Sequence, residues 1–452
     1  MKRMDFFAGQ GARAAATWLP QAGAASKRPF PDLACSGVAP ARTRLRPPSP
    51  GRRHSLDYSN DEQRRHAEKD AVSCSDVCEA DHYMADLLIV ALHARLLACS
   101  ARRGGYRVNV LDLYNDCDTR AAAVQSRKVA QHGNGFDAAT LLAMAQQFWP
   151  APAALIAGAG FEDNLELLTQ LARGRVVYGN SAATIAQVKD PQSFFSLLDK
   201  LSIPHPHVSL TVPRDMAGWL VKRIGGHGGT HVLPAQRRPP NSDDAAHYFQ
   251  RRVSGRNCSV LFLADGAKAC IIGFNKQYVA QVNGSPYWYA GAINRVKLRP
   301  EVREEIARKL DDLVAAFSLR GLNSLDFMAN GDSYRVLEVN PRPSATMDLY
   351  DADFPDGIFD AHLQACDGRL PDSTPIGKVR THAVIYAPRT AHLGLHFRFP
   401  EWCSDIPEAG SKFPRGAPVC LVHAEGKNVP DVERLIEQRR SALYSGLFAQ
   451  VA

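Results

Sequence analysis

The chain has 452 residues, of which 45% are hydrophobic and 22% charged, as is usual for a globular protein of two or three domains. No apolar run approaches the roughly 20 residues of a membrane span, which argues against a membrane protein. The formal net charge of +8 comes from residues 1–56, which contain ten Lys/Arg and two Asp. The rest of the chain has 54 − 10 = 44 Lys/Arg and 46 − 2 = 44 Asp/Glu, so it is neutral, which argues against nucleic-acid binding.

Residues 1–83 are predicted to be a disordered basic leader. They are rich in Arg, Pro, Ala and Ser, with "RLRPPSPGRRHS" as the extreme, and have no sustained apolar period. A transit peptide is one alternative, although no convincing amphipathic helix is present. Another is an over-called start, with translation beginning at Met84. The ten cysteines are scattered singly and no secretory signal is evident, so we expect a cytoplasmic protein with free thiols.

Residues 84–180 are expected to form a parallel α/β domain. "DLLIVAL" is typical of a buried strand, "HARLLACSARRGG" of a helix and "YRVNVLDL" of a second strand. A further strand, "AALIAGAG", leads into the helix "FEDNLELLTQLARG". Asp112 could bind a ribose at the end of the second strand, but no glycine-rich turn follows the first strand. An NAD-dependent oxidoreductase is therefore the last of the alternatives.

Residues 181–370 have a mixed pattern of helices and strands. A helical stretch with Lys189 inside it, "SAATIAQVKDPQSFFSLLDKLSIPHP", comes first. Strands, a helix at "PEVREEIARKLDDLVAAFSLRG" and a hairpin follow. Residues 371–452 contain short strands such as "HAVIYAP" and a final helix, so they are expected to form a small β-rich extension.

The hairpin "LDFMANGDSYRVLEVNPRPS", residues 325–344, carries the first candidate site. A three-residue loop, Gly331 to Ser333, places Asp326 opposite Glu338. Strand alternation then puts Asp326, Glu338 and Asn340 on one face, and Leu325, Phe327, Leu337 and Val339 on the other. Two facing carboxylates repel unless a cation lies between them, and all-oxygen ligands suit Mg²⁺ or Mn²⁺. Arg342 could reach a phosphate on that metal; the alternative is a solvated hairpin edge.

A glycine loop in "VKRIGGHGGTHV" is the second candidate site. Lys222 ends a strand, and Gly225, Gly226, Gly228 and Gly229 follow. Backbone amides without side chains can approach phosphate oxygens closely, and a lysine balances the charge. The spacing is not that of a P-loop, because no Gly-Lys-Ser/Thr ends it.

The order of these parts resembles the ATP-grasp superfamily. The resemblance rests on Lys189, on Lys222 with its glycine loop, on "FQRRVSG", on Asp326 and on "LEVNPRP". It is strongest to predicted ATP-dependent carboligases related to biotin carboxylase, some of which are associated with tetrahydromethanopterin-type cofactor biosynthesis. It implies α/β and α+β architecture: an N-terminal parallel α/β (pre-ATP-grasp) domain at 84–180, an ATP-grasp domain of two α+β subdomains at 181–370, and the extension at 371–452.

The resemblance also implies roles for individual residues. Lys189 and Lys222 would hold the α- and β-phosphates of ATP, Gly225 to Gly229 would form a lid, and Gln250, Arg251, Arg252 and Val253 would form the adenine hinge. Asp326, Glu338 and Asn340 would ligate one or two Mg²⁺, Arg342 would steady the transferring phosphoryl group, and Arg295 in "AGAINRVKL" would bind the acceptor carboxylate. The chain departs from its relatives where Arg251 and Arg252 replace an acid, and where His227 interrupts the glycine loop.

These features predict an ATP-dependent ligase that activates a small-molecule carboxylate as an acyl phosphate for attack by an amine. A carboxylase- or phosphotransferase-type relative is an alternative with a different acceptor. A non-catalytic ATP sensor is another, although such a protein is expected to have lost a metal ligand and all three are present. The sequence does not identify the carboxylate and the amine. It does not determine the oligomeric state either, and a homodimer is one option because members of the superfamily are often dimers.

Overall fold

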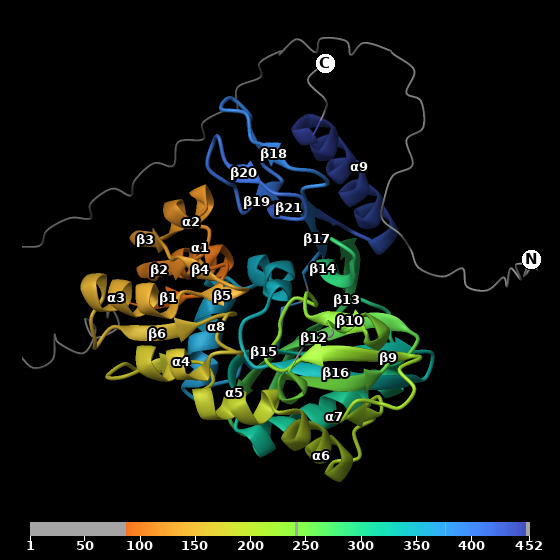
Figure 1. Ribbon diagram of the computed structural model, residues 1–452. Helices are drawn as coiled ribbons and strands as arrows, with labels where there is room; N and C mark the ends of the chain where they lie inside the picture. The colour runs from red at the N-terminus through yellow and green to blue at the C-terminus, as the bar shows by residue number, and fades with distance from the viewer. Residues whose placement is uncertain (1–86, 240–242, 376, 449–452) are drawn as a thin grey trace, which may run out of the picture. The chain divides into compact units, whose positions relative to one another are not determined.

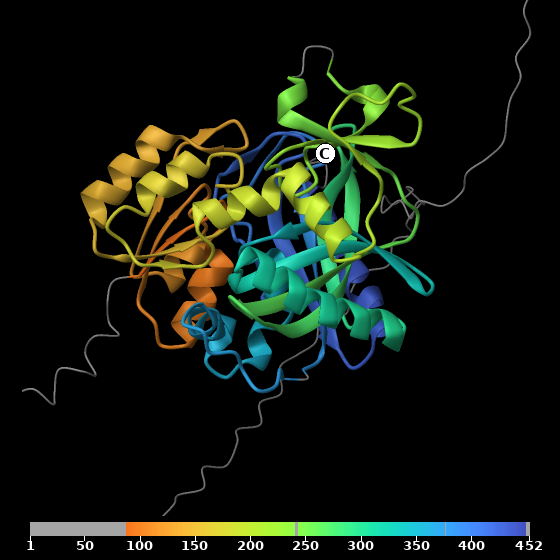
Figure 2. The same ribbon diagram turned by 90° about the horizontal axis from the view of Figure 1, so that it is seen from below.

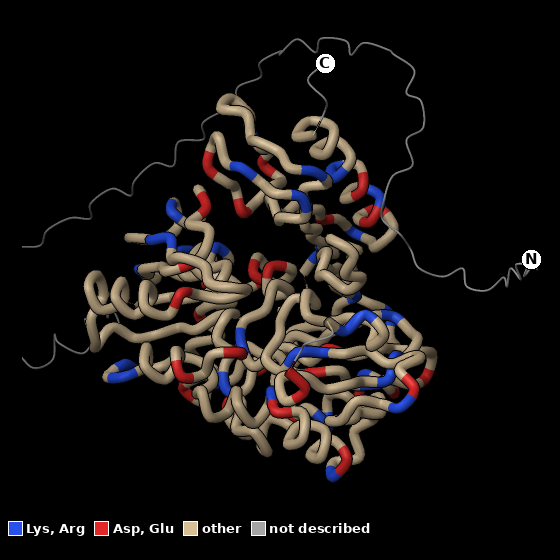
Figure 3. Tube along the Cα trace, viewed as in Figure 1, with Lys and Arg blue, Asp and Glu red and all other residues tan. Residues whose placement is uncertain are grey.

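The computed structural model describes residues 87–239, 243–375 and 377–448. All of them belong to one unit of the chain, Tyr83–Ala452. The basic leader expected at 1–83 lies outside the described residues. Within the described ranges, Lys/Arg and Asp/Glu are interspersed along the trace (Figure 3).

A parallel sheet of five strands begins the described chain. Its order is β3-β2-β1-β6-β7, and all four pairs are parallel. The strands are β1 (Leu87–Val90), β2 (Val108–Asp112), β3 (Gln125–Lys128), β6 (Ala154–Ala157) and β7 (Val177–Tyr178). The helices that alternate with them are α1 (Arg95–Arg103), α2 (Cys117–Ala122), α3 (Ala138–Phe148) and α4 (Leu165–Leu171), and a small hairpin joins β4 (Gln131–His132) to β5 (Gly135–Phe136). The predicted parallel α/β region is therefore confirmed.

The chain order of these strands creates a switch point between β1 and β6. From β1 the chain moves outward to β2 and β3, then returns to β6 on the other side and continues to β7. Loops at the carboxyl ends of two such strands diverge, and open α/β sheets bind ligands in the crevice between them. The loop that follows β6, residues 158–164, is thus placed to contribute to a site.

A four-stranded antiparallel sheet with two helices forms the next part. The helices are α5 (Ala182–Lys189) and α6 (Pro191–Lys200); the sheet has the order β10-β9-β11-β8, with β8 (Val208–Ser209), β9 (Trp219–Arg223), β10 (Val232–Pro234) and β11 (His247–Arg251). The one long helical stretch expected here is two helices. Pro191 lacks an N–H and begins α6, while the Asp190 carboxylate accepts from the Ser193 N–H at 2.7 Å. This break leaves Lys189 as the last residue of α5.

An eight-stranded sheet of order β16-β15-β12-β13-β14-β17-β21-β19 is the largest element of the fold. It contains β12 (Arg256–Asp265), β13 (Ala269–Val282), β14 (Ser285–Asn294), β15 (Arg320–Asn330), β16 (Ser333–Asn340), β17 (Val379–Tyr386), β19 (Cys403–Ser404) and β21 (Pro418–Gly426). The helix α7 (Pro300–Phe317) packs its apolar face on β12, β15 and β16 beside α6 (Figure 2). Phe327 is fully buried in this core, where such a side chain contributes about 1.5–3 kcal/mol.

The C-terminal part continues the same sheet instead of forming a separate one. β14 pairs with β17, so strands from the expected extension are joined directly to the preceding part of the chain. The extension still has its own core, between β17, β21 and α9 (Val429–Phe448) (Figure 1). The helix α8 (Gly357–Cys366) precedes β17, and β18 (Ala391–His392) pairs with β20 (Lys412–Phe413). No helix in the described ranges has the length and apolar character needed to cross a bilayer.

The combination of a parallel sheet, a small antiparallel sheet and a large antiparallel sheet confirms the predicted fold class. The proposed domain boundaries at 180 and 370 stay predictions, because one sheet runs across the second of them.

Candidate functional site

The hairpin of β15 and β16 places Asp326 directly opposite Glu338, as expected. The expected loop is wrong, however. Asn330 pairs with Ser333, so the turn contains only Gly331 and Asp332. A β-bulge between Asp326 and Phe327 then shifts the register by one residue and restores the predicted pairing at the site. The shorter turn and the bulge each shift the register by one residue, and the two shifts cancel at Asp326 and Glu338.

The bulge changes which side chains share the face of Glu338. Phe327 pairs with Val336, and Asp326 pairs with Glu338, so Leu337 is the extra residue. Leu337 lines the same pocket as Glu338, whereas Val336 and Val339 are buried in the core on the other side. The prediction that Leu337 faces that core is wrong, because alternation fails at a bulge.

A polar network joins the three predicted metal ligands to Lys189. The Asn340 Nδ2 donates to Asp326 Oδ2 at 3.1 Å. The Lys189 Nζ lies 3.3 Å from Glu338 Oε2 and 3.3 Å from Asn340 Oδ1. Gln277 also donates to Asp326 Oδ1, at 3.1 Å. The structure thus brings together four residues that the sequence predicted from two separate segments.

The two carboxylates have opposite pKa shifts. Burial and the neighbouring Glu338 charge raise the pKa of Asp326. Burial alone would also raise the pKa of Glu338, but Lys189, Lys222 and His231 together lower it. Cations therefore favour the ionised form of Glu338, while burial and the Glu338 charge disfavour the ionised form of Asp326.

The arrangement fits a divalent cation. A carboxylate pair with an amide oxygen beside it is an all-oxygen donor set. Within the described ranges no group of three or more His, Cys, Asp or Glu side chains could hold a metal ion, so Asn340 is needed to complete this set.

Lys222 lies in β9, one residue before its end, and the glycine loop joins β9 to β10. Lys222 is only 5% exposed, burial lowers its pKa, and Glu338 and Asp326 act to raise it. Gly225, Gly228 and Gly229 have φ of 72°, 63° and 71°, which only glycine adopts readily. A Cβ at Gly229 would lie 1.9 Å from the Tyr287 carbonyl oxygen. The loop therefore requires glycine for two reasons, its backbone conformation and its close packing.

Arg342 is held by an acid that the sequence analysis did not identify. Its Nε donates to Glu162 Oε1 at 2.6 Å, and Glu162 Oε2 accepts from the Gly160 and Phe161 N–H groups at 2.8 and 3.1 Å. Burial would raise the pKa of Glu162, but Arg342, Lys189 and His227 hold it at about 2. The sequence signal that could have identified Glu162 is its position in "GAGFED", directly after the strand β6 at the switch point.

The predicted adenine hinge lies at the end of β11. Gln250 is 1% exposed, and its Nε2 reaches the Leu337 carbonyl at 3.5 Å. The Arg252 N–H donates to Gly218 O at 2.8 Å, so that amide is already engaged. The Arg251 guanidinium donates to Ala217 O at 2.7 Å and lies over the Trp219 ring. Val253 follows on the loop to β12.

The structure does not bring Arg295 to this group. Arg295 is exposed, follows β14, has φ of 57° and donates to the Gly377 carbonyl. Strands β12 and β13 separate β14 from β15. At about 4.8 Å per strand, Arg295 lies roughly 14 Å across the sheet from the row of Asp326.

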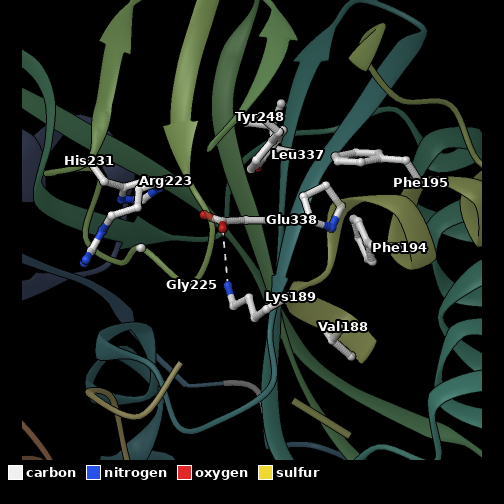
Figure 4. Close-up of a pocket in the computed structure, with 12 residues that line it drawn as sticks. Val188, Lys189, Phe194, Phe195, Arg223, Gly225, His231, Tyr248, Leu337 and Glu338 are labelled. Carbon is white, nitrogen blue, oxygen red and sulfur yellow. Dashed lines mark hydrogen bonds and ion pairs between the residues drawn. The ribbon is translucent and has the colours of Figure 1, made fainter. Parts of the chain in front are cut away.

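A pocket adjoins Lys189 and Glu338, which approach each other from opposite walls (Figure 4). About 350 Å³ of space that no atom fills lies within the pocket and the open solvent at its mouth. Its lining residues are Val188, Lys189, Pro191, Phe194, Phe195, Arg223, Gly225, Gly226, His231, Tyr248, Leu337 and Glu338. Sequence reasoning missed the aromatic side chains and His231, because nothing in their local pattern separates pocket residues from core residues.

Comparisons with known proteins find similarity over part of the chain. The sequence profile of the ATP-grasp domain matches residues 188–346. The chain is 27% identical over 217 residues to the carbamoyl phosphate synthase large chain of Pasteurella multocida (strain Pm70), a stretch that covers 43% of this chain and 20% of that protein. It is 24% identical over 200 residues to the carbamoyl phosphate synthase arginine-specific large chain of Bacillus subtilis (strain 168), a stretch that covers 38% of this chain and 18% of that protein. The matched stretch thus spans about a fifth of these relatives.

Solved structures share the fold over a longer range. A biotin carboxylase–β-γ-ATP complex from Campylobacter jejuni has a TM-score of 0.63 at 12% identity, covering 77% of this chain and 89% of that one. The L-amino acid ligase from Bacillus licheniformis has a TM-score of 0.60 at 13% identity, covering 79% and 97%. At these identities the likeness concerns the fold alone. The stretch that matches the ATP-grasp profile includes Lys189, the glycine loop and the hairpin.

Proposed function

We propose that this protein is an ATP-dependent enzyme that joins a small-molecule carboxylate to an amine. The observation that carries the proposal is the convergence of Lys189 on Glu338 and Asn340, with Asp326 opposite. Lys222 and the glycine loop approach the same place from another sheet. Cations and carboxylates on facing walls suit a triphosphate with its metal.

The pocket supports a place for the nucleotide. Tyr248, Leu337 and Phe195 give part of it an apolar wall, while Lys189 and Glu338 give it a charged wall. Sites for small ligands commonly combine such an apolar body with a few polar groups. We place the base towards the apolar side, with Gln250 to Val253 as its hinge, and the phosphates towards Lys189, Lys222 and the loop.

Asp326, Glu338 and Asn340 would hold Mg²⁺ or Mn²⁺. When bound, the ion offsets charge on the β- and γ-phosphate oxygens. The chain's own cations do the rest: Lys189 and Lys222 bind and orient the triphosphate, and Arg342, fixed by Glu162, lies ready to contact the transferring phosphoryl group. Positioning and charge stabilisation account for most of phosphoryl-transfer catalysis, so no protein nucleophile is needed.

The proposed chemistry has two steps. A carboxylate oxygen attacks the γ-phosphorus and ADP leaves, which gives an acyl phosphate. The amine then attacks the carbonyl carbon, phosphate leaves, and the nitrogen loses a proton. Arg295 stays a proposal for binding the acceptor carboxylate, and its distance from the row of Asp326 would require a long substrate. A role in tetrahydromethanopterin-type cofactor biosynthesis, a cytoplasmic location and a homodimer are likewise proposals.

The test is ADP formation by the full-length protein with panels of carboxylates and amines, in the presence of Mg²⁺. We expect ADP release only when both substrates are supplied, and none from the Glu338→Gln variant. ATP binding without turnover on any panel would favour a sensor. ADP release that needs bicarbonate rather than an amine would favour a carboxylase-type enzyme.

A further inference from the structure

The glycine loop carries one side chain that the proposed function does not use, that of His227. Its Nδ1 atom is buried and has no hydrogen-bond partner among the described residues. Leaving a buried polar atom unpaired costs about 1–3 kcal/mol. Such atoms are uncommon in native proteins, and a role in binding or catalysis is one reason for them.

The surroundings of His227 connect it to the phosphoryl end of the site. Its electrostatic neighbours are, in order of strength, Glu162, Arg342, Asp163 and Arg223. Burial lowers the pKa of the His227 ring more than Glu162 raises it. The ring is therefore neutral near pH 7, and a neutral imidazole has one nitrogen that donates and one that accepts.

The loop backbone fixes the position from which this ring projects. The Thr230 hydroxyl donates to the His227 carbonyl at 3.1 Å, and the Gly228 carbonyl accepts from the Tyr289 N–H at 3.0 Å. By contrast, no backbone carbonyl within the described ranges accepts from the N–H groups of His227, Gly228 and Gly229. One loop thus carries three amide donors without a backbone acceptor and an unpaired imidazole nitrogen, while its carbonyls are engaged.

We propose that His227 donates from Nδ1 to an oxygen of the terminal phosphate of bound ATP, and so makes the loop distinguish ATP from ADP. This inference rests on the proposed function, because it requires a triphosphate beneath the loop. ADP alone offers no such oxygen, so the ring is unpaired again once the transferred phosphate has left. The contact therefore favours binding of the triphosphate and release of the diphosphate.

The experiment is calorimetric titration of the full-length protein with ATP and with ADP, both with Mg²⁺. The variants are His227→Gly, which restores an all-glycine loop, and His227→Gln, which keeps a side-chain donor. We expect His227→Gly to weaken ATP binding about tenfold or more and to change ADP binding less than about twofold. His227→Gln should lose less ATP affinity than His227→Gly. His132→Gly, in the exposed strand β4, is the matched control and should change neither affinity.

Two results would overturn the inference while leaving the proposed function intact. One is a His227→Gly variant that binds both nucleotides as the wild type does. The other is an equal loss of affinity for ATP and ADP. A folded wild type that binds neither nucleotide would overturn the proposed function and this inference with it. Thermal unfolding of each variant establishes whether it is folded. If His227→Gly does not fold, the ATP and ADP affinities of His227→Gln test the inference instead.

Discussion

The cations of the site are held by acids that lie far from them in the sequence. Arg342 meets Glu162 across 180 positions, and Lys189 meets Glu338 across 149. The Glu162 side chain is 2% exposed and that of Arg342 13%. Breaking a buried pair of this kind by removing one partner is costly, because the other charge loses its compensation.

The Glu162 carboxylate should give the protein a specific pH dependence of stability. Its folded pKa of about 2 lies below the ordinary value of 4.5. Because that pKa is depressed, its contribution is present above pH 4.5 and is lost as the pH falls towards 2. The shift corresponds to about 3 kcal/mol. We predict that Glu162→Gln lowers the free energy of unfolding by roughly this amount at pH 7.

Urea unfolding between pH 7 and pH 3 checks this prediction. The difference between wild type and Glu162→Gln should be constant above about pH 4.5 and should shrink below it. Glu166→Gln, at an exposed position on α4, is the control and should have little effect at any pH. A difference between wild type and Glu162→Gln that does not change with pH would contradict the assigned pKa.

At the scale of elements, the periodic patterns predicted most of the strands and helices that surround the site. The buried run at Leu87–Val90 and the apolar face of α7 are strong signals because each repeats over several residues. The bulge at Leu337 was not predictable in this way. It depends on a two-residue turn and on the packing of both faces, which no local pattern encodes. Pro191 was an available signal for the end of α5, but the prediction continued one helical stretch through it.

The glycine loop allows a prediction with an internal control. Gly228 and Gly229 have similar left-handed φ, so alanine at either carries a backbone penalty of about 1–2 kcal/mol. A Cβ at Gly228 meets nothing closer than 4.0 Å, whereas at Gly229 it meets the Tyr287 carbonyl oxygen at 1.9 Å. We predict that Gly229→Ala lowers the free energy of unfolding by at least about 1 kcal/mol more than Gly228→Ala. Equal losses in urea unfolding would mean that the loop is not packed against β14 as described.

At the scale of the whole described unit, Arg95 connects three parts of the chain. It lies on α1, and its Nε donates to Asp405 Oδ1 of the C-terminal part at 2.7 Å. Its Nη2 lies 3.4 Å from Asp348 Oδ2, next to the hairpin segment. Burial would raise the pKa of Asp348, but Arg95, His423 and His382 hold it at about 2. This buried network ties the parallel sheet to the two parts that follow it.

Replacing Arg95 should therefore destabilise the unit as a whole. Arg95→Met leaves Asp348 and Asp405 without their shared cation, which costs about 3–5 kcal/mol when a buried pair is broken. Arg102→Met, at an exposed position on the same helix, is the control and should cost less than about 1 kcal/mol. Urea unfolding measures both. Similar losses for the two variants would show that the network contributes little to stability.

The central claim is that one face of the β15–β16 hairpin holds a metal-bound triphosphate. Its most direct test is calorimetric titration of the full-length protein with ATP, with and without Mg²⁺, for the wild type and for the Glu338→Ala/Asn340→Ala variant. The account predicts binding that depends on Mg²⁺ and that the double variant weakens about tenfold or more. ATP affinity that is indifferent both to Mg²⁺ and to the two substitutions would contradict it.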